Sequence, residues 1–156
     1  MFREMRRQDR ATSLEEAKEI VRTQNHGVLS VIGDEGYPYG VPVNYGYVED
    51  KIYIHSTSES SHKIDAITAN PKVCLTVIAK HDLIEQELTT AFRSAVVFGT
   101  ARIITDMEEK QRAIYRMMMG LAPKLAEHAK EHCKGTEHTF SMIEITPEHI
   151  TGKARK

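Results

Sequence analysis

This chain of 156 residues has no large excess of positive or negative charge. Its 21 lysine and arginine residues nearly balance 22 aspartate and glutamate residues, and the formal net charge at pH 7 is -1. A protein that binds a nucleic-acid backbone usually carries a broad positive field, which this composition does not provide. We therefore expect no nucleic-acid partner.

Long apolar runs and cysteines are also scarce. No apolar stretch approaches the length that a membrane-spanning helix needs, and residues 1–7 lack the apolar segment of a secretory signal. The two cysteines, Cys74 and Cys133, are too few for a disulfide framework and fit a reducing compartment. We expect a cytoplasmic protein with no membrane contact.

The length and composition are typical of one domain. Hydrophobic residues make up 40% of the chain and charged residues 28%, and no run rich in Pro, Ser or Gly is long enough to act as a linker. We expect a single domain over residues 1–156, in which flexibility is confined to residues 1–10 and 153–156.

The local patterns predict a mainly β, α+β protein. Ser13 and Glu16 form a capping box that starts a helix. Runs rich in β-branched and aromatic residues then predict about six antiparallel strands, while residues 81–92 show no clear pattern. The strands are expected at 28–32, 37–48, 51–56, 73–79, 94–104 and 139–146, and further helices at 60–70, 106–119 and 121–132. Gly99, inside the fifth of these strands, predicts a bulge or bend. Such a sheet should close, at least in part, because closure removes exposed edges.

The stretch from Tyr53 to Lys63 is the most informative part of the sequence. It places hydroxyl groups and cations between a strand end and a helix start, where backbone N–H groups and the helix dipole favour an anion. This chemistry suits a phosphate group. The alternative is a polar loop in which Ser60 or Ser61 merely caps the helix, and the pattern by itself leaves both readings open.

Several segments together carry a resemblance to a known family. They are His26–Ser30, Gly36–Tyr45, His55–Ser56, His62–Asp65, Asn70–Val73, Ser94–Gly99 and Thr151–Lys153. In their order and spacing the chain resembles the pyridoxamine 5′-phosphate oxidase-like flavin-binding split barrels, and within them the 5-nitroimidazole resistance (Nim) proteins. The resemblance implies a six-stranded antiparallel split β-barrel with flanking short helices, which pairs with a second copy and binds FMN between the two chains.

The resemblance also implies the residues of the site. The isoalloxazine ring would lie against Val43, Asn44 and Tyr45, and the ribityl chain and phosphate against His55, Ser56 and Thr57. The phosphate grip would be completed by Ser60, His62 and Lys63, and Ser94 would contact the flavin across the dimer. His55 and His62 are both candidates for the histidine that is associated with activity in Nim relatives.

The function expected from this resemblance is an FMN-dependent oxidoreductase. It would transfer electrons from a reduced nucleotide to a small acceptor such as a nitro-aromatic compound, and the alternative is a non-catalytic carrier of flavin (FMN or FAD) or haem on the same scaffold. Two departures from the family matter. Ser61 stands where relatives often have glycine, which predicts a constrained backbone near the phosphate, and the C-terminal arginine-rich segment of true pyridoxamine 5′-phosphate oxidases is missing.

Four metal-ligating side chains gather late in the sequence, namely His128, His132, Cys133 and His138. His128 and His132 lie four residues apart on one helical face, a spacing that can bind a transition metal. Nothing nearby supplies a convincing further ligand. We interpret the group as a solvated helix end and expect no metal.

Overall fold

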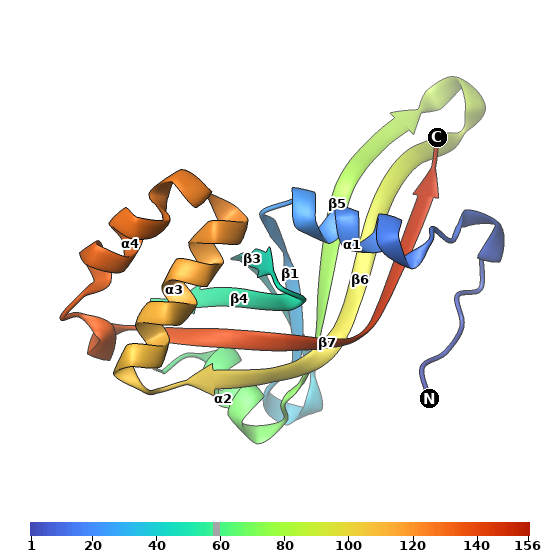
Figure 1. Ribbon diagram of the computed structural model, residues 1–156. Helices are drawn as coiled ribbons and strands as arrows, with labels where there is room; N and C mark the ends of the chain where they lie inside the picture. The colour runs from blue at the N-terminus through green and yellow to red at the C-terminus, as the bar shows by residue number, and fades with distance from the viewer. Residues whose placement is uncertain (58–59) are drawn as a thin grey trace.

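The computed structural model describes residues 1–57 and 60–156 and confirms the α+β fold. In these residues seven antiparallel strands form one sheet in the order β2-β1-β5-β6-β7-β4-β3 (Figure 1). The strands are β1 (His26–Ile32), β2 (Pro38–Asn44), β3 (Gly46–Val48), β4 (Lys51–Ser56), β5 (Lys72–Ile84), β6 (Thr89–Ile104) and β7 (Ser141–Arg155). The helices are α1 (Leu14–Thr23), α2 (His62–Ala69), α3 (Met107–Leu121) and α4 (Ala126–Cys133).

The strand predicted over residues 37–48 is divided at Tyr45. The Tyr45 side chain is fully buried, its hydroxyl donates to the carbonyl of Val21 at 2.6 Å, and its N–H donates to the carbonyl of Asn25 at 3.0 Å. Because these bonds draw Tyr45 out of the ladder, β2 pairs with β1 while β3 pairs with β4. The division accounts for seven strands where the sequence indicated about six.

Residues 81–92, which showed no pattern in the sequence, continue β5 and β6 as a long hairpin. Pairing runs from His81 opposite Phe92 to Ile84 opposite Thr89, and the hairpin extends away from the body of the protein (Figure 1). The end of β7 joins it, so the residues up to Arg155 are part of the sheet and not a loose tail. The predicted bulge at Gly99 is confirmed by a register shift against β7.

Two apolar clusters stabilise the fold. The first fills the inside of the curved sheet and includes Leu29, Leu75 and Ile143. The second lies between α3 and the opposite side of β4 and β7, where Tyr53 and Met117 are buried. Each strand of the β4–β7 pair is therefore covered on both sides, and α3 with α4 forms a layer over it (Figure 1).

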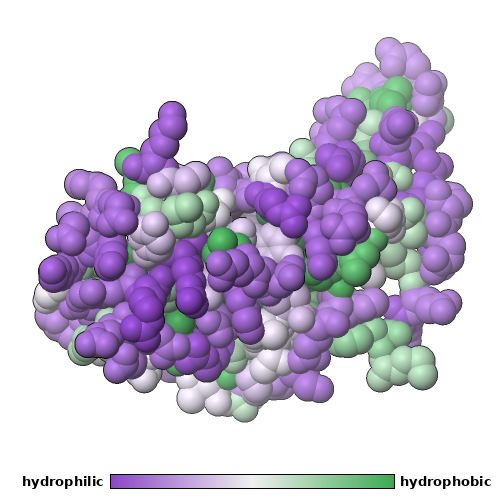
Figure 2. All heavy atoms as spheres, in the orientation of Figure 1, coloured by the Kyte–Doolittle hydropathy of each residue, from purple (hydrophilic) through white to green (hydrophobic). Residues whose placement is uncertain are grey.

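Helix α1 begins as predicted, since the Ser13 hydroxyl accepts from the N–H of Glu16 and the Glu16 carboxylate accepts from the N–H of Ser13. The face of the protein drawn in Figure 2 is mainly hydrophilic, and hydrophobic residues surface there in small areas. Among the described helices, none is long and apolar enough to cross a membrane.

Candidate functional site

A pocket lies where the ends of β2 and β4 meet the start of α2 and the C-terminal half of α3. Its volume is about 340 Å³, and we call it the β2–β4 pocket. It is lined by Pro42, Val43, Asn44, His55, Thr57, Lys63, Met117 and Leu121. Five of these residues, Val43, Asn44, His55, Thr57 and Lys63, belong to the site that the sequence predicted, and tertiary folding brings them together from three separate elements.

Strand and helix geometry explain why these side chains meet. In β4 successive side chains alternate between the two faces, so His55 lies on the face opposite to the core residue Ile54 and beside Met142 of β7, its partner in the ladder. Helix α2 is capped by the Ser61 hydroxyl, which accepts from the N–H of Ile64 at 3.4 Å. Lys63 therefore lies in the first turn of α2.

His55 is the titratable group at the centre of this pocket. Its ring is half-buried, and its centroid lies 5.0 Å from that of the Phe140 ring. Burial lowers the pKa of His55 below its ordinary 6.5, and the positive charge of Lys63 lowers it further. The imidazole is therefore neutral at neutral pH, with one protonated ring nitrogen and one that can accept a proton.

His62, the other candidate histidine, is engaged elsewhere. Its Nε2 accepts a hydrogen bond from the N–H of Asp34 at 3.2 Å and lies 3.8 Å from the Asp34 carboxylate. Its ring also stacks on Tyr39, with centroids 4.2 Å apart. His62 thus joins the start of α2 to the turn between β1 and β2, and it does not line the β2–β4 pocket.

The remaining predicted residues lie outside the pocket lining. Tyr45 and Ser56 turn their side chains into the protein, where they are 0% and 2% exposed. Ser60 is exposed just before α2, and Ser94 lies in β6 opposite Ile78. The predicted phosphate-binding stretch also includes Ser58 and Glu59, which are outside the described residues.

The backbone constraint that the sequence predicted at Ser61 is absent from the structure. Its φ is −161° and its ψ is 165°, an extended conformation that any residue adopts. Glycine would be needed only if φ were positive. Ser61 instead acts as the cap of α2, so the replacement of glycine by serine leaves the backbone near the pocket unstrained.

Sequence reasoning missed the contribution of α3 to the pocket. Met117 is 5% exposed and Leu121 is half-buried, and together they form an apolar wall opposite β4. The local sequence signal was the run Met117–Met119, which is typical of adaptable core packing. Met117 does pack in the second apolar cluster, and the same position also borders the pocket.

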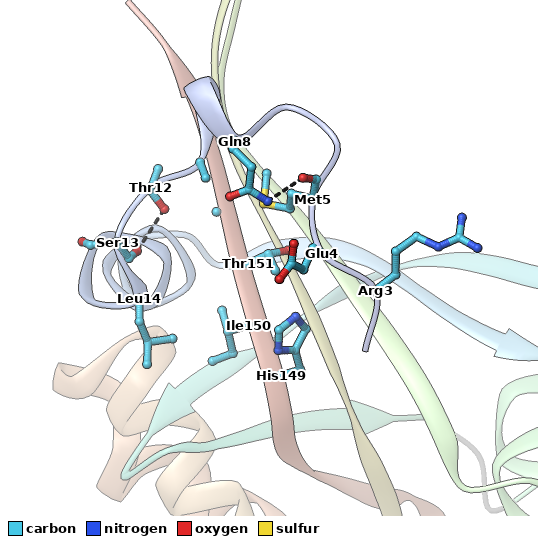
Figure 3. A pocket seen from close by; sticks show the side chains of 12 residues that line it. Arg3, Glu4, Met5, Gln8, Thr12, Ser13, Leu14, His149, Ile150 and Thr151 are labelled. Atoms are coloured by element: carbon cyan, nitrogen blue, oxygen red, sulfur yellow. Dashed lines mark hydrogen bonds between the residues drawn. The ribbon is translucent and has the colours of Figure 1, made fainter. Parts of the chain in front are cut away.

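Another cavity, of about 300 Å³, lies between the N-terminal segment and β7 (Figure 3). It contains none of the predicted site residues. Two of its polar side chains are bonded within their own segment, since Gln8 donates to the carbonyl of Met5 and Thr12 to that of Ser13. At the N-terminus of α1 beside this cavity, the N–H groups of Ser13 and Glu16 are already hydrogen-bonded in the capping box.

The late histidines do not assemble a metal site in the part of the chain that the structure describes. The rings of His128 and His132 stack with centroids 6.1 Å apart on α4. No group of three or more His, Cys, Asp or Glu side chains in residues 1–57 and 60–156 is arranged to hold a metal ion.

Solved structures share this fold. A candidate 5-nitroimidazole antibiotic resistance protein from Bacteroides thetaiotaomicron is 25% identical, with a TM-score of 0.70 over 92% of this chain and 85% of its own. A FAD-binding protein from Mesorhizobium loti is 22% identical, with a TM-score of 0.71 over 94% and 98%. A FAD and heme binding protein from Mycobacterium smegmatis is 19% identical, with a TM-score of 0.78 over 93% and 72%.

Sequence comparison assigns the family directly. None of the curated proteins compared with the chain matches it. The family model described as pyridoxamine 5′-phosphate oxidase, however, matches residues 13–154, nearly the whole chain. With the sheet and the pocket already described, this match means that the chain belongs to the pyridoxamine 5′-phosphate oxidase family.

Proposed function

We propose that this protein is a flavin-dependent oxidoreductase that binds FMN in the β2–β4 pocket. It transfers electrons from a reduced nicotinamide nucleotide to a small acceptor such as a nitro-aromatic compound. The observation that carries the proposal is the meeting of Val43, Asn44, His55, Thr57 and Lys63 in one pocket. The likeness to a candidate 5-nitroimidazole antibiotic resistance protein supports the class of acceptor.

The residues of the pocket fit the chemistry of a flavin. A phosphate needs a cation and fixed hydrogen-bond donors, which Lys63 and the Thr57 hydroxyl supply near the start of α2. A ring needs apolar surface with a polar group at one edge. Met117 and Leu121 offer that surface, and the Asn44 amide offers both a donor and an acceptor.

When bound, the flavin supplies the electron-transfer chemistry, and the protein supplies binding and orientation. Lys63 holds the phosphate through its charge. Met117 and Leu121 exclude water from one side of the pocket. His55 presents a neutral imidazole whose ring nitrogens can hydrogen-bond to an acceptor molecule and exchange a proton with it as electrons arrive.

We also propose that the site is completed by a second copy of the chain. A pocket of 340 Å³ is near the lower end of the ~300–1,000 Å³ usual for ligand sites, so a whole flavin needs a further wall. The outward face of β1, β5 and β6 carries large apolar side chains, of which Ile32, Ile78 and Phe98 are exposed by 48%, 57% and 37%. We call it the open sheet face.

Sheet register connects the open sheet face to the pocket. Pro42, which lines the pocket, lies opposite Val28, and Ser94 lies opposite Ile78 on the same face. Two copies that pack through this face would bury its apolar side chains. They would also carry Ser94 of each chain into the seam, where the resemblance expects it to contact flavin.

The test is anaerobic mixing of the FMN-loaded protein with NADH or NADPH and then with a nitroimidazole. The flavin absorbance should fall on reduction and return when the acceptor is added. A flavin that is never reoxidised by any acceptor would instead favour a carrier, and purification with a haem spectrum in place of a flavin spectrum would overturn the choice of cofactor.

A further inference from the structure

Lys110, the fourth residue of α3, is a buried lysine. It is 2% exposed, and its Nζ donates to the carbonyl oxygens of Glu137 and Phe140, both at 2.7 Å. Burying an ammonium group is unfavourable unless hydrogen bonds replace its water. These two bonds meet part of that need, and they tie α3 to the segment that leads into β7.

Phe140 connects this lysine to the β2–β4 pocket. Its side chain is 4% exposed. The Lys110 Nζ lies 5.5 Å from the centroid of the Phe140 ring, within the range of a cation–π contact. The same ring contacts the His55 imidazole, with centroids 5.0 Å apart and planes at 46°. One aromatic ring therefore touches both the buried cation and the pocket histidine.

We propose that Lys110 is a positioning residue for His55 and acts through Phe140. By holding both the carbonyl and the ring of Phe140, Lys110 fixes the apolar surface on which the imidazole rests. This surface sets the orientation of His55 in the pocket and shields one side of it from water. The inference rests on the proposed function for the role of His55, whereas the chain of contacts itself needs no flavin.

The surroundings of His55 make this effect measurable. Among the described residues that line the pocket, Lys63 from α2 is the one cationic side chain, while β2 contributes Asn44 and α3 contributes Met117 and Leu121. Both burial and Lys63 lower the pKa of His55. If Phe140 loses its support, water should reach the imidazole, and the pKa of His55 should rise toward 6.5 because the charged form is better solvated.

Gln111 provides a matched control. It follows Lys110 in α3, and its Nε2 donates to the carboxylate of Glu137, so it holds the same segment before β7. Its bond is to a side chain of that segment and not to Phe140. A Gln111→Met variant should therefore loosen the segment without releasing the ring that contacts His55.

The experiment is an NMR titration of the His55 imidazole in flavin-free protein, with thermal unfolding of each variant measured alongside. Lys110→Met and Phe140→Leu should both raise the pKa of His55 and change its ring chemical shifts. Gln111→Met should lower the unfolding temperature and leave the His55 titration as in the wild type. Lys110→Met also retains most of the side-chain volume, which limits repacking.

Two results would overturn the proposal. One is an unchanged His55 titration in Lys110→Met, whatever the result with Phe140→Leu; the other is an equal change in Gln111→Met. If Lys110→Met does not fold, Lys110→Arg, which keeps the charge but changes the geometry of the two carbonyl bonds, is titrated in its place and judged by the same criterion. FMN binding by the wild type is measured separately, so a protein that ignores FMN would contradict the proposed function and leave this test intact.

Discussion

The imidazole of His62 stacks on the ring of Tyr39 with centroids 4.2 Å apart, whereas the imidazole of His55 lies in the β2–β4 pocket. The two histidines are only seven positions apart in sequence, and both stand next to residues that suit a phosphate. Their side chains nevertheless serve different parts of the fold. This difference separates two candidates that the sequence left equal.

Replacing the two histidines in turn should separate their roles. His55→Gln should retain FMN but lower the rate of flavin reoxidation by a nitroimidazole by about 100-fold, the usual scale of lost proton-transfer catalysis. His62→Gln should lose about 1 kcal/mol of stability through its Asp34 hydrogen bond and keep the rate. Stopped-flow absorbance and urea unfolding measure the two effects. The reverse pattern would assign the chemistry to His62.

Lysine substitutions should test the phosphate end of the pocket. Lys63→Ala should weaken FMN binding by roughly 10- to 100-fold, because a hydrogen bond to a charged group contributes about 1.5–3 kcal/mol. Lys130→Ala is the control, since its Nζ lies 5.9 Å above the Tyr115 ring, outside the pocket and the proposed seam. Fluorescence titration with FMN gives both constants. Equal losses in the two variants would refute the assignment of Lys63.

Position 61 should respond as a helix cap and not as a strained backbone site. Since φ at Ser61 is −161°, Ser61→Gly relieves no strain and should not tighten FMN binding. Ser61→Ala should lower the free energy of unfolding by about 1 kcal/mol, the typical loss when a capping hydroxyl is removed. Urea unfolding and FMN titration of both variants check this. Tighter FMN binding by Ser61→Gly would show that the serine does constrain the site.

The open sheet face should control the oligomeric state. Ile78→Glu places a charge on this face and should convert a dimer to a monomer with weaker FMN binding. Leu125→Glu is the control, because Leu125 is exposed to a similar extent, 52% against 57%, but lies beyond the C-terminal end of α3. Sedimentation equilibrium gives the masses. A wild-type monomer, or a dimer that survives Ile78→Glu, would contradict the proposed seam.

The free energy of unfolding should decrease as the pH is lowered, and part of this decrease should come from His55. Its pKa is lower in the folded protein than the ordinary 6.5, so between these two values the unfolded chain binds more protons. The free energy of unfolding should therefore be highest above pH 6.5 and decrease as the pH drops toward the folded-state pKa. His55→Gln should remove this part of the dependence. Urea unfolding at a series of pH values measures the difference between the two proteins.

Local patterns predicted the elements whose causes are local. The capping box at Ser13 and Glu16 needs only residues three apart, and the bulge at Gly99 follows from one glycine in a strand. The strands over residues 81–92 were not predicted, because neither face of the projecting hairpin is buried in a core. No alternation of apolar and polar residues therefore marks them. The break between β2 and β3 at Tyr45 was not predicted either. It depends on hydrogen bonds to Val21 and Asn25, which lie more than one element away in the sequence.

By itself the sequence determined the starts of α1 and α3, most of the strands, the family resemblance and the residue types of the predicted phosphate site, because these depend on spacing within short segments. The start of α4 was not among them, since the helix expected at 121–132 begins at Ala126. Only the tertiary structure decided that His55 and Lys63 share a pocket with Met117, that His62 belongs to the β1–β2 turn, and that Phe140 links His55 to Lys110. Side-chain contacts between distant segments follow from how the sheet curves and how α3 packs on it. No local spacing encodes that packing.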